Sequence, residues 1–99
     1  MNETPNQQTA VELLQELGLK EYEARCFVAL SRRPQGTAKD ISEMSQVPRT
    51  RVYDAIEVLE TMGLVEVQHS NPKQFRAVPI DEAVETIRSE NEEQIEALR

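Results

Sequence analysis

The chain has few of the residues that cross-link small domains or build metal and catalytic centres. It contains one cysteine, Cys26, and one histidine, His69, in 99 residues. A single cysteine cannot form an internal disulfide, and this pair cannot supply the ligand set of a structural zinc site. We therefore expect no disulfide scaffold, no metal and no cofactor. We expect Cys26 to be a small core residue and His69 to lie on the surface at a strand end.

Long hydrophobic runs are also lacking. The longest, such as residues 26–30, are far shorter than the roughly 20 residues of a membrane span, and residues 1–10 lack the features of a signal peptide. We therefore expect a cytosolic protein without membrane contact. A length of 99 residues suits one domain with a modest core, and no phosphate loop or nucleophile–base pair is evident, so we expect no enzymatic activity.

Positive charge is scarce and unevenly distributed. The chain has 11 Lys and Arg against 18 Asp and Glu, a net charge of −7. The one net positive stretch is residues 31–52, with five basic and two acidic residues, whereas residues 81–99 carry two basic and seven acidic residues. Nucleic-acid-binding domains are usually basic, so a surface of that kind must be small and must come from the middle of the sequence.

Hydrophobic spacing predicts two helices in the first third of the chain. Apolar side chains recur at helical spacing over residues 11–17, and Gly18 ends this helix. A second helix is expected from about Lys20 to Ser31, with Tyr22 and Cys26 among the residues on its buried side. Two helices therefore precede the positive stretch.

A short helix, a tight turn and a longer helix are predicted next. Thr37 is a good N-cap, with Asp40 three residues later as a loose capping box. Residues 45–47 form the turn, Pro48 takes the first position of the longer helix, and Gly63 ends it. The buried residues expected in these two helices are Ala38, Ile41, Met44, Val52, Ala55, Ile56, Leu59 and Met62.

The last third of the chain predicts a hairpin and a final helix. Residues 64–69 alternate as a strand, residues 70–73 turn, and residues 74–78 return. Asp81 is the expected N-cap of the final helix, whose thin apolar stripe suits a partner helix. We expect this stripe to mediate dimerisation through Val84, Ile87, Asn91, Ile95 and Leu98.

The order of these elements is that of a winged helix-turn-helix, a mainly α fold with a small β-hairpin. We divide the chain into a disordered lead-in (1–8), the winged domain (9–79) and a C-terminal dimerisation or linker helix (80–99). In this fold the second helix of the pair presents its N-terminal residues to the major groove of DNA. The sequence therefore predicts a sequence-specific DNA-binding transcriptional regulator that acts on double-stranded DNA.

The candidate DNA-binding residues follow from this placement. The predicted recognition helix begins with Arg49, Thr50, Arg51 and Tyr53. Arginine can donate two hydrogen bonds to guanine, but Arg49 and Arg51 lie about 200° apart on a helical wheel, so we expect one to read bases and the other to hold a phosphate. We expect Tyr53 to contact a phosphate from the face that carries Arg49. Further expected backbone contacts are Lys39, Arg32, Arg33, Lys73, Gln74 and Arg76.

Other interpretations of these residues stay open. Arg49 and Arg51 also fit solvated charges on an amphipathic helix, and Arg32 with its neighbour fits the C-terminal end of the preceding helix. Arg76 fits a pair with Glu66 across the hairpin. At the level of function, the alternatives are a winged-helix protein-interaction module that does not bind DNA and a coiled-coil adaptor built on the final helix.

Five short motifs resemble the N-terminal DNA-binding domain of the TrmB family of archaeal transcriptional regulators. They are LGL (17–19), EYEA (21–24), VPRTRVY (47–53), GLV (63–65) and FRAVP (75–79). The resemblance runs from about residue 13 to residue 87, and residues 47–53 are its most specific part. It implies promoter binding as a homodimer, with control by a sugar or metabolite effector through a C-terminal domain. Such a domain lies outside these 99 residues, so we expect either a fragment of a longer regulator or a short relative.

Two positions depart from the family pattern, and the composition adds one more expectation. Gln46 stands in a turn where glycine is frequent, and Asn71 stands in the hairpin where glycine is common. Fifteen Glu, eight Arg and three Lys resemble the balance in proteins of salt-loving archaea, although three Asp are fewer than expected there. In molar salt the Debye length is about 3 Å, so specificity would come from close contacts.

Overall fold

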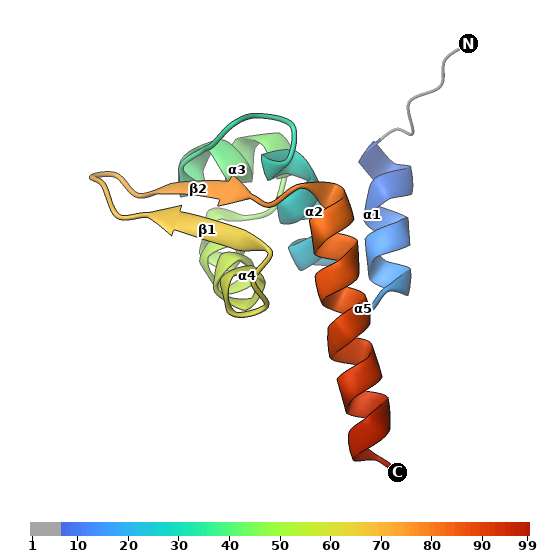
Figure 1. Cartoon of the computed structure of the whole chain (residues 1–99). Helices are drawn as coiled ribbons and strands as arrows, with labels where there is room; N and C mark the ends of the chain where they lie inside the picture. Colours follow the sequence, from blue (N-terminus) through green and yellow to red (C-terminus); the bar gives the residue numbers. More distant parts are fainter. Residues whose placement is uncertain (1–6) are drawn as a thin grey trace.

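The computed structural model describes residues 7–99 and confirms a mainly helical winged helix-turn-helix with a two-stranded antiparallel hairpin (Figure 1). None of the helices within these residues is long and apolar enough to cross a bilayer. In chain order the elements are α1 (Gln7–Glu16), α2 (Glu21–Leu30), α3 (Ala38–Ser45), α4 (Arg49–Thr61), β1 (Val65–Gln68), β2 (Gln74–Ala77) and α5 (Ile80–Ala97).

Helix α1 begins earlier than the sequence predicts. Gln7 and Gln8, expected in a disordered lead-in, form its first turn, and residues 1–6 of that lead-in lie outside the described residues. Val11 and Leu14 are buried, as their spacing predicts. The chain then reverses at Gly18, whose φ of +114° is a conformation that side chains rarely adopt.

Helix α2 is the centre of the core and packs against α1, α3 and α4. Cys26 is buried as expected, and burial raises the pKa of its thiol to about 11. The sequence prediction was wrong at Tyr22, which is 38% exposed. Its neighbour Glu23 is buried instead, because the Glu23 carboxylate caps α2 by accepting a hydrogen bond of 3.0 Å from the Lys20 backbone N–H.

The capping box at the start of α3 is confirmed. The Thr37 hydroxyl accepts a hydrogen bond of 3.1 Å from the Asp40 N–H, and the Asp40 carboxylate accepts one of 3.0 Å from the Thr37 N–H. Met44 is half-buried rather than buried, and Ser45 takes the inner position. Pro48 is the N-cap of α4 and not its first helical residue, since its ψ of 141° is not helical.

Helix α4 and the hairpin match their predicted positions. The buried residues of α4 are Val52, Ala55, Ile56 and Leu59, and Met62 is half-buried. Glu66 lies opposite Arg76 and forms an ion pair with it, which confirms the cross-strand interpretation of Arg76. Backbone hydrogen bonds of 2.9 and 2.7 Å also join Gly36 to Phe75. This short bridge ties the segment before α3 to the hairpin, and the sequence did not predict it.

Helix α5 is anchored at one end only. Its N-cap is Pro79, not Asp81 as predicted. Ala83 and Ile87 are buried in the core, so Ile87, at 1% exposure, is not available for the dimerisation stripe in which the sequence placed it. Residues 88–99 are all exposed, and α5 extends away from the rest of the domain (Figure 1).

Candidate nucleic-acid interface

The N-terminal end of α4 is the most exposed part of the helix-turn-helix. Because α4 packs through one side, Arg49, Thr50, Arg51 and Tyr53 all face solvent, and Tyr53 is 53% exposed. Within residues 7–99, the guanidinium groups of Arg49 and Arg51 have no hydrogen bond or ion pair. Both cations are therefore available to an external partner. This exposure fits both the predicted DNA contact and the alternative interpretation of Arg49 and Arg51 as solvated charges on an amphipathic helix.

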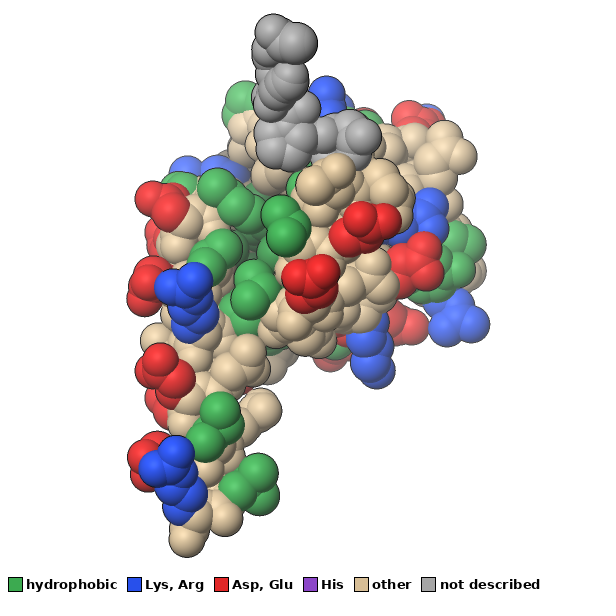
Figure 2. Space-filling model, turned by 90° about the vertical axis from the view of Figure 1, so that its right-hand side faces the viewer, with side chains coloured by type: hydrophobic (Ala, Val, Ile, Leu, Met, Phe, Trp, Pro, Cys, Tyr) green, Lys and Arg blue, Asp and Glu red, His purple; other side chains and the backbone are tan. Residues whose placement is uncertain are grey.

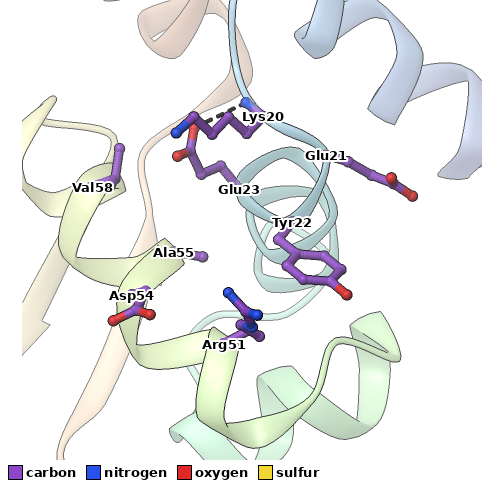
Figure 3. A pocket seen from close by; sticks show the side chains of 8 residues that line it. All are labelled: Lys20, Glu21, Tyr22, Glu23, Arg51, Asp54, Ala55 and Val58. Carbon is purple, nitrogen blue, oxygen red and sulfur yellow. Dashed lines mark hydrogen bonds between the residues drawn. The ribbon is translucent and has the colours of Figure 1, made fainter.

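The structure separates the two arginines, as the helical wheel predicts. Arg49 and Tyr53 line a hollow of about 450 Å³ between α4 and the hairpin, which also contains Lys73 from the hairpin tip. Arg51 lines a different hollow of about 400 Å³ between α4 and the start of α2. In Figure 3 its side chain rises from α4 toward α2 beside the ring of Tyr22. Each arginine thus serves one flank of α4.

Carboxylates follow directly behind this basic end. Glu57 and Glu60 line the hairpin-side hollow with Arg49, and Asp54 lines the other hollow with Arg51. Positive charge on α4 is therefore confined to its first turn. A polyanion that approaches the middle of α4 meets carboxylates, so contact is favoured only at the N-terminal end.

The other predicted basic contacts differ in how far they are already engaged. Lys39, Arg32 and Lys73 are exposed, and Gln74 on β2 is half-buried. Arg33, by contrast, donates a hydrogen bond of 2.8 Å to the Gln35 carbonyl oxygen.

Two ion pairs also affect this surface. Arg33 lies 3.8 Å from the Asp40 carboxylate, and Arg76 is paired with Glu66. Hydrogen bonds from the Thr37 backbone and side chain, together with the Arg33 charge, lower the pKa of Asp40. A phosphate contact by Arg33 or Arg76 therefore has to compete with a carboxylate that is already present.

Sequence reasoning missed Arg25. Its guanidinium donates hydrogen bonds to the carbonyl oxygens of Ser45 and Gln46 in the turn that precedes α4. The partners lie about 20 residues apart in the sequence, so no local spacing signals the contact.

A second exposed surface lies on α1 and α5. Figure 2 shows hydrophobic side chains gathered over these two helices and more of them farther along α5. The exposed large apolar residues of α1 and α5 are Leu13, Ile80, Ile95 and Leu98. Asn91 donates a hydrogen bond of 3.4 Å to the Leu17 carbonyl oxygen, which joins α5 to the end of α1. Residues 92–99 are all exposed, so the end of α5 is not packed against the rest of the described chain.

Comparison with known sequences gives consistent matches. Residues 14–81 match the family described as "Sugar-specific transcriptional regulator TrmB". The chain is 30% identical over 89 residues to the HTH-type sugar sensing transcriptional regulator TrmBL1 of Pyrococcus furiosus, covering 90% of this chain and 26% of that protein. It is 35% identical over 86 residues to the DNA-binding HTH-type transcriptional repressor TrmBL2 of Thermococcus kodakarensis, covering 86% and 33%.

A bacterial relative also matches, so similarity is not confined to archaea. It is the uncharacterized protein YrhO of Bacillus subtilis, 32% identical over 83 residues, which cover 84% of this chain and 30% of that protein. The chain thus spans about a quarter to a third of the length of these curated relatives.

Comparison with solved structures agrees with these sequence matches. The structure of TrmBL2, described as an archaeal chromatin protein with a novel mode of DNA binding, superposes with a TM-score of 0.85 at 31% identity and covers 93% of this chain and 37% of that chain. A MarR-family regulator from Silicibacter pomeroyi has a TM-score of 0.65 at 16% identity, covering 94% and 68%. The second match bears on the fold alone.

Proposed function

The chain belongs to the TrmB family of sugar-specific transcriptional regulators, and from this premise we propose that it binds duplex DNA as a regulator and reads the major groove with α4. The observation that carries the proposal is the unpaired cationic end of α4, on a chain whose net charge is −7. Because acidic residues dominate elsewhere, this end is where a polyanion is least repelled. The descriptions of TrmBL2 as DNA-binding support the same conclusion.

The two flanks of α4 suggest different roles for its arginines. Arg49 shares its hollow with Tyr53 and Lys73, a grouping that suits a backbone phosphate held between α4 and the hairpin. We assign base contact to Arg51, whose planar fork matches the two acceptors of guanine, together with Thr50 on the outermost line of the helix.

Other backbone contacts are ranked by how available each side chain is. Lys39 and Arg32 are exposed and unpaired within residues 7–99, and we assign them to phosphates together with Gln74. Arg33 and Arg76 contribute less, because each would have to leave its carboxylate partner.

We further propose that a second copy of the chain pairs through α5. Val84, Asn91 and Leu98 are spaced seven residues apart, the period of a coiled-coil seam. Val84 is half-buried and Asn91 donates to the Leu17 carbonyl oxygen, so Leu98 is the most available member of this row. Ile95 and Leu13 widen the apolar surface. A two-fold dimer would present two α4 helices to an inverted repeat in the DNA. We propose that a sugar or metabolite controls DNA binding only in a longer protein in which an effector domain is joined to these residues.

The test is a titration of fluorescent duplex DNA followed by anisotropy. The Arg49→Ala/Arg51→Ala variant is compared with Arg88→Ala/Arg99→Ala, which removes the same charge from α5. We expect the first variant to lose about five- to 150-fold in affinity per arginine, roughly 1–3 kcal/mol each, and the control to bind like the wild type. Equal binding by both variants would overturn the assignment to α4.

A selection experiment then tests sequence specificity. Bound duplexes are recovered from a random pool and sequenced, and we expect an enriched inverted repeat with half-sites about 10 bp apart or a multiple of that. Binding without enrichment would contradict groove reading and leave DNA binding through phosphates only. Absence of binding by the wild type would instead favour the protein-interaction alternative.

A further inference from the structure

Arg25 contacts the turn that leads into α4. Its Nη2 atom lies 2.9 Å from the Ser45 carbonyl oxygen and 3.2 Å from that of Gln46, and its Nε atom lies 3.2 Å from the Ser45 oxygen. Carbonyl groups at the end of a helix have no partner within the helix, and the helix dipole makes that end negative. Arg25 therefore supplies both the missing donors and the complementary charge at the end of α3.

The turn needs such support because of its backbone conformation. Gln46 has φ 64° and ψ 21°, and it is the one residue other than glycine with positive φ within residues 7–99. A side chain disfavours this conformation, which persists where surrounding contacts impose it. Two serines also hold the turn: the Ser42 hydroxyl donates to the Val47 carbonyl oxygen at 2.7 Å, and the Ser45 hydroxyl accepts from the Val47 N–H at 3.2 Å.

The guanidinium is itself oriented by residues of α2. Glu21 lies one helical turn before Arg25, with its carboxylate 3.5 Å from Nη1, and the ring of Tyr22 lies 5.8 Å from the guanidinium carbon. These two contacts leave the guanidinium aimed at the turn and not at solvent. The sequence placed Tyr22 in the core. Its exposure is explained by its packing on Arg25 and by its position beside Arg51 (Figure 3).

We infer that Arg25 is a positioning residue: it clamps the α3–α4 turn in its left-handed conformation and so sets the direction in which α4 presents Arg49 and Arg51. Helix α4 begins three residues after Gln46, so any change in the turn moves the whole exposed end. The consequence for DNA rests on the proposed function, whereas the clamp itself is a property of the protein alone. Lysine is a poor substitute, because one ammonium group lacks the planar fork that spans two carbonyl groups.

The first measurement uses the free protein and needs no DNA. Amide hydrogen exchange is followed in the wild type, Arg25→Ala, Arg25→Lys and the control Arg88→Ala, with folding checked by circular dichroism. We expect both Arg25 variants to speed exchange at Gln46, Val47 and Val52 at least tenfold, with the amides of Met62 and Ala83 unchanged. Exchange that is unchanged at the turn, or faster everywhere by the same factor, would overturn the clamp.

The second measurement compares affinity for a selected duplex with affinity for a random one. We expect Arg25→Ala and Arg25→Lys to lose most of the ratio between the two affinities. Adding Gln46→Gly to Arg25→Ala should recover it, since glycine holds the left-handed turn without help. Full activity of Arg25→Lys, or no recovery by glycine, would overturn positioning in favour of charge alone. If the wild type binds no duplex, the proposed function fails, and the exchange data still decide the clamp.

Discussion

Helices α4 and α5 both present exposed faces, but they are held in very different ways. Helix α4 is buried along its length through Val52, Ala55, Ile56 and Leu59. Helix α5 is buried only near its start, and residues 88–99 are exposed. Their charges also differ, since the first turn of α4 carries Arg49 and Arg51, whereas residues 81–99 carry seven acidic and two basic groups.

The difference fits the two tasks that we propose for this domain, DNA binding by α4 and pairing by α5. A helix that fits a rigid duplex, as proposed for α4, must keep its direction, and α4 is held by the core and by the hydrogen bonds of Arg25 to the preceding turn. In the proposed dimer, a helix that pairs with a copy of itself can be left unsupported until the copy arrives, and the residues of α5 beyond Asn91 are all exposed. Acidic residues on α5 also disfavour its contact with DNA, which is consistent with the separate partners proposed for the two helices.

The largest expected effect comes from removing the anchor of α4. Leu59→Ala, at a side chain with 1% exposure, should lower the free energy of unfolding by about 2–5 kcal/mol. Leu98→Ala, at 88% exposure on α5, should change it by less than about 0.5 kcal/mol when the chain is monomeric. Urea unfolding at low protein concentration measures both. Equal losses would mean that the end of α5 is part of the folded core.

The next largest effect is that of salt, which should weaken duplex binding by α4 and strengthen the pairing of α5. With about four phosphate contacts the logarithm of duplex affinity should fall with the logarithm of salt concentration at a slope of about −3.6, which is a loss of roughly 150-fold between 50 and 200 mM. Pairing of two acidic α5 helices should strengthen over the same range, because their repulsion is screened. Anisotropy and sedimentation measure the two trends. Parallel trends would contradict the separation, and loss of duplex binding well below 1 M salt would count against a halophilic working range.

A smaller effect is expected when the outer half of α5 loses its apolar side chains. Ile95→Ala/Leu98→Ala should weaken dimerisation by about ten- to a hundredfold, or about 1.4–2.7 kcal/mol, since side chains near the end of α5 gain only part of the roughly 1.5–3 kcal/mol that each yields when fully buried. The control is Ile80→Ala, which removes an exposed side chain at the anchored end. Sedimentation equilibrium gives the dissociation constants. A wild type that stays monomeric at high concentration, or a double variant that still pairs, would refute the α5 seam.

The smallest effect concerns pH and the cap of α3, the helix that supports the turn before α4. Since the pKa of Asp40 is lowered in the folded state, its contribution is complete above the unfolded value and disappears as pH falls through the folded value. We expect stability to decline below about pH 4, near the ordinary pKa of Asp, and Asp40→Asn to lose this part of the decline. Unfolding curves between pH 2 and 6 measure it. Identical profiles for both proteins would contradict the cap.

Local signals predicted much of this fold because they act over a few residues. The Thr37 capping box, the reversal at Gly18 and the Glu66–Arg76 pairing depend on neighbours or on hairpin register, and all three are confirmed. The exposed, divided arginines of α4 followed from helical geometry in the same way.

The errors arise where distant segments decide the outcome. Ile87 fits a dimer seam by spacing, but α5 docks its first turns on the core and buries that residue. Tyr22 has an inward position by its type, yet it packs on Arg25 at the surface. The contact of Arg25 with the turn joins segments far apart in the sequence, so periodicity could not predict it.

Nuclear magnetic resonance of the isotope-labelled chain shows directly whether the basic end of α4 is the DNA-binding surface, as we propose. Backbone amide shifts are recorded while a selected duplex is added. The largest changes are expected at residues 49–53 and at the hairpin tip around Lys73. Residues 88–99 should not shift on addition of DNA, except where DNA also promotes dimerisation. Changes centred on α5, or none at α4, would contradict it.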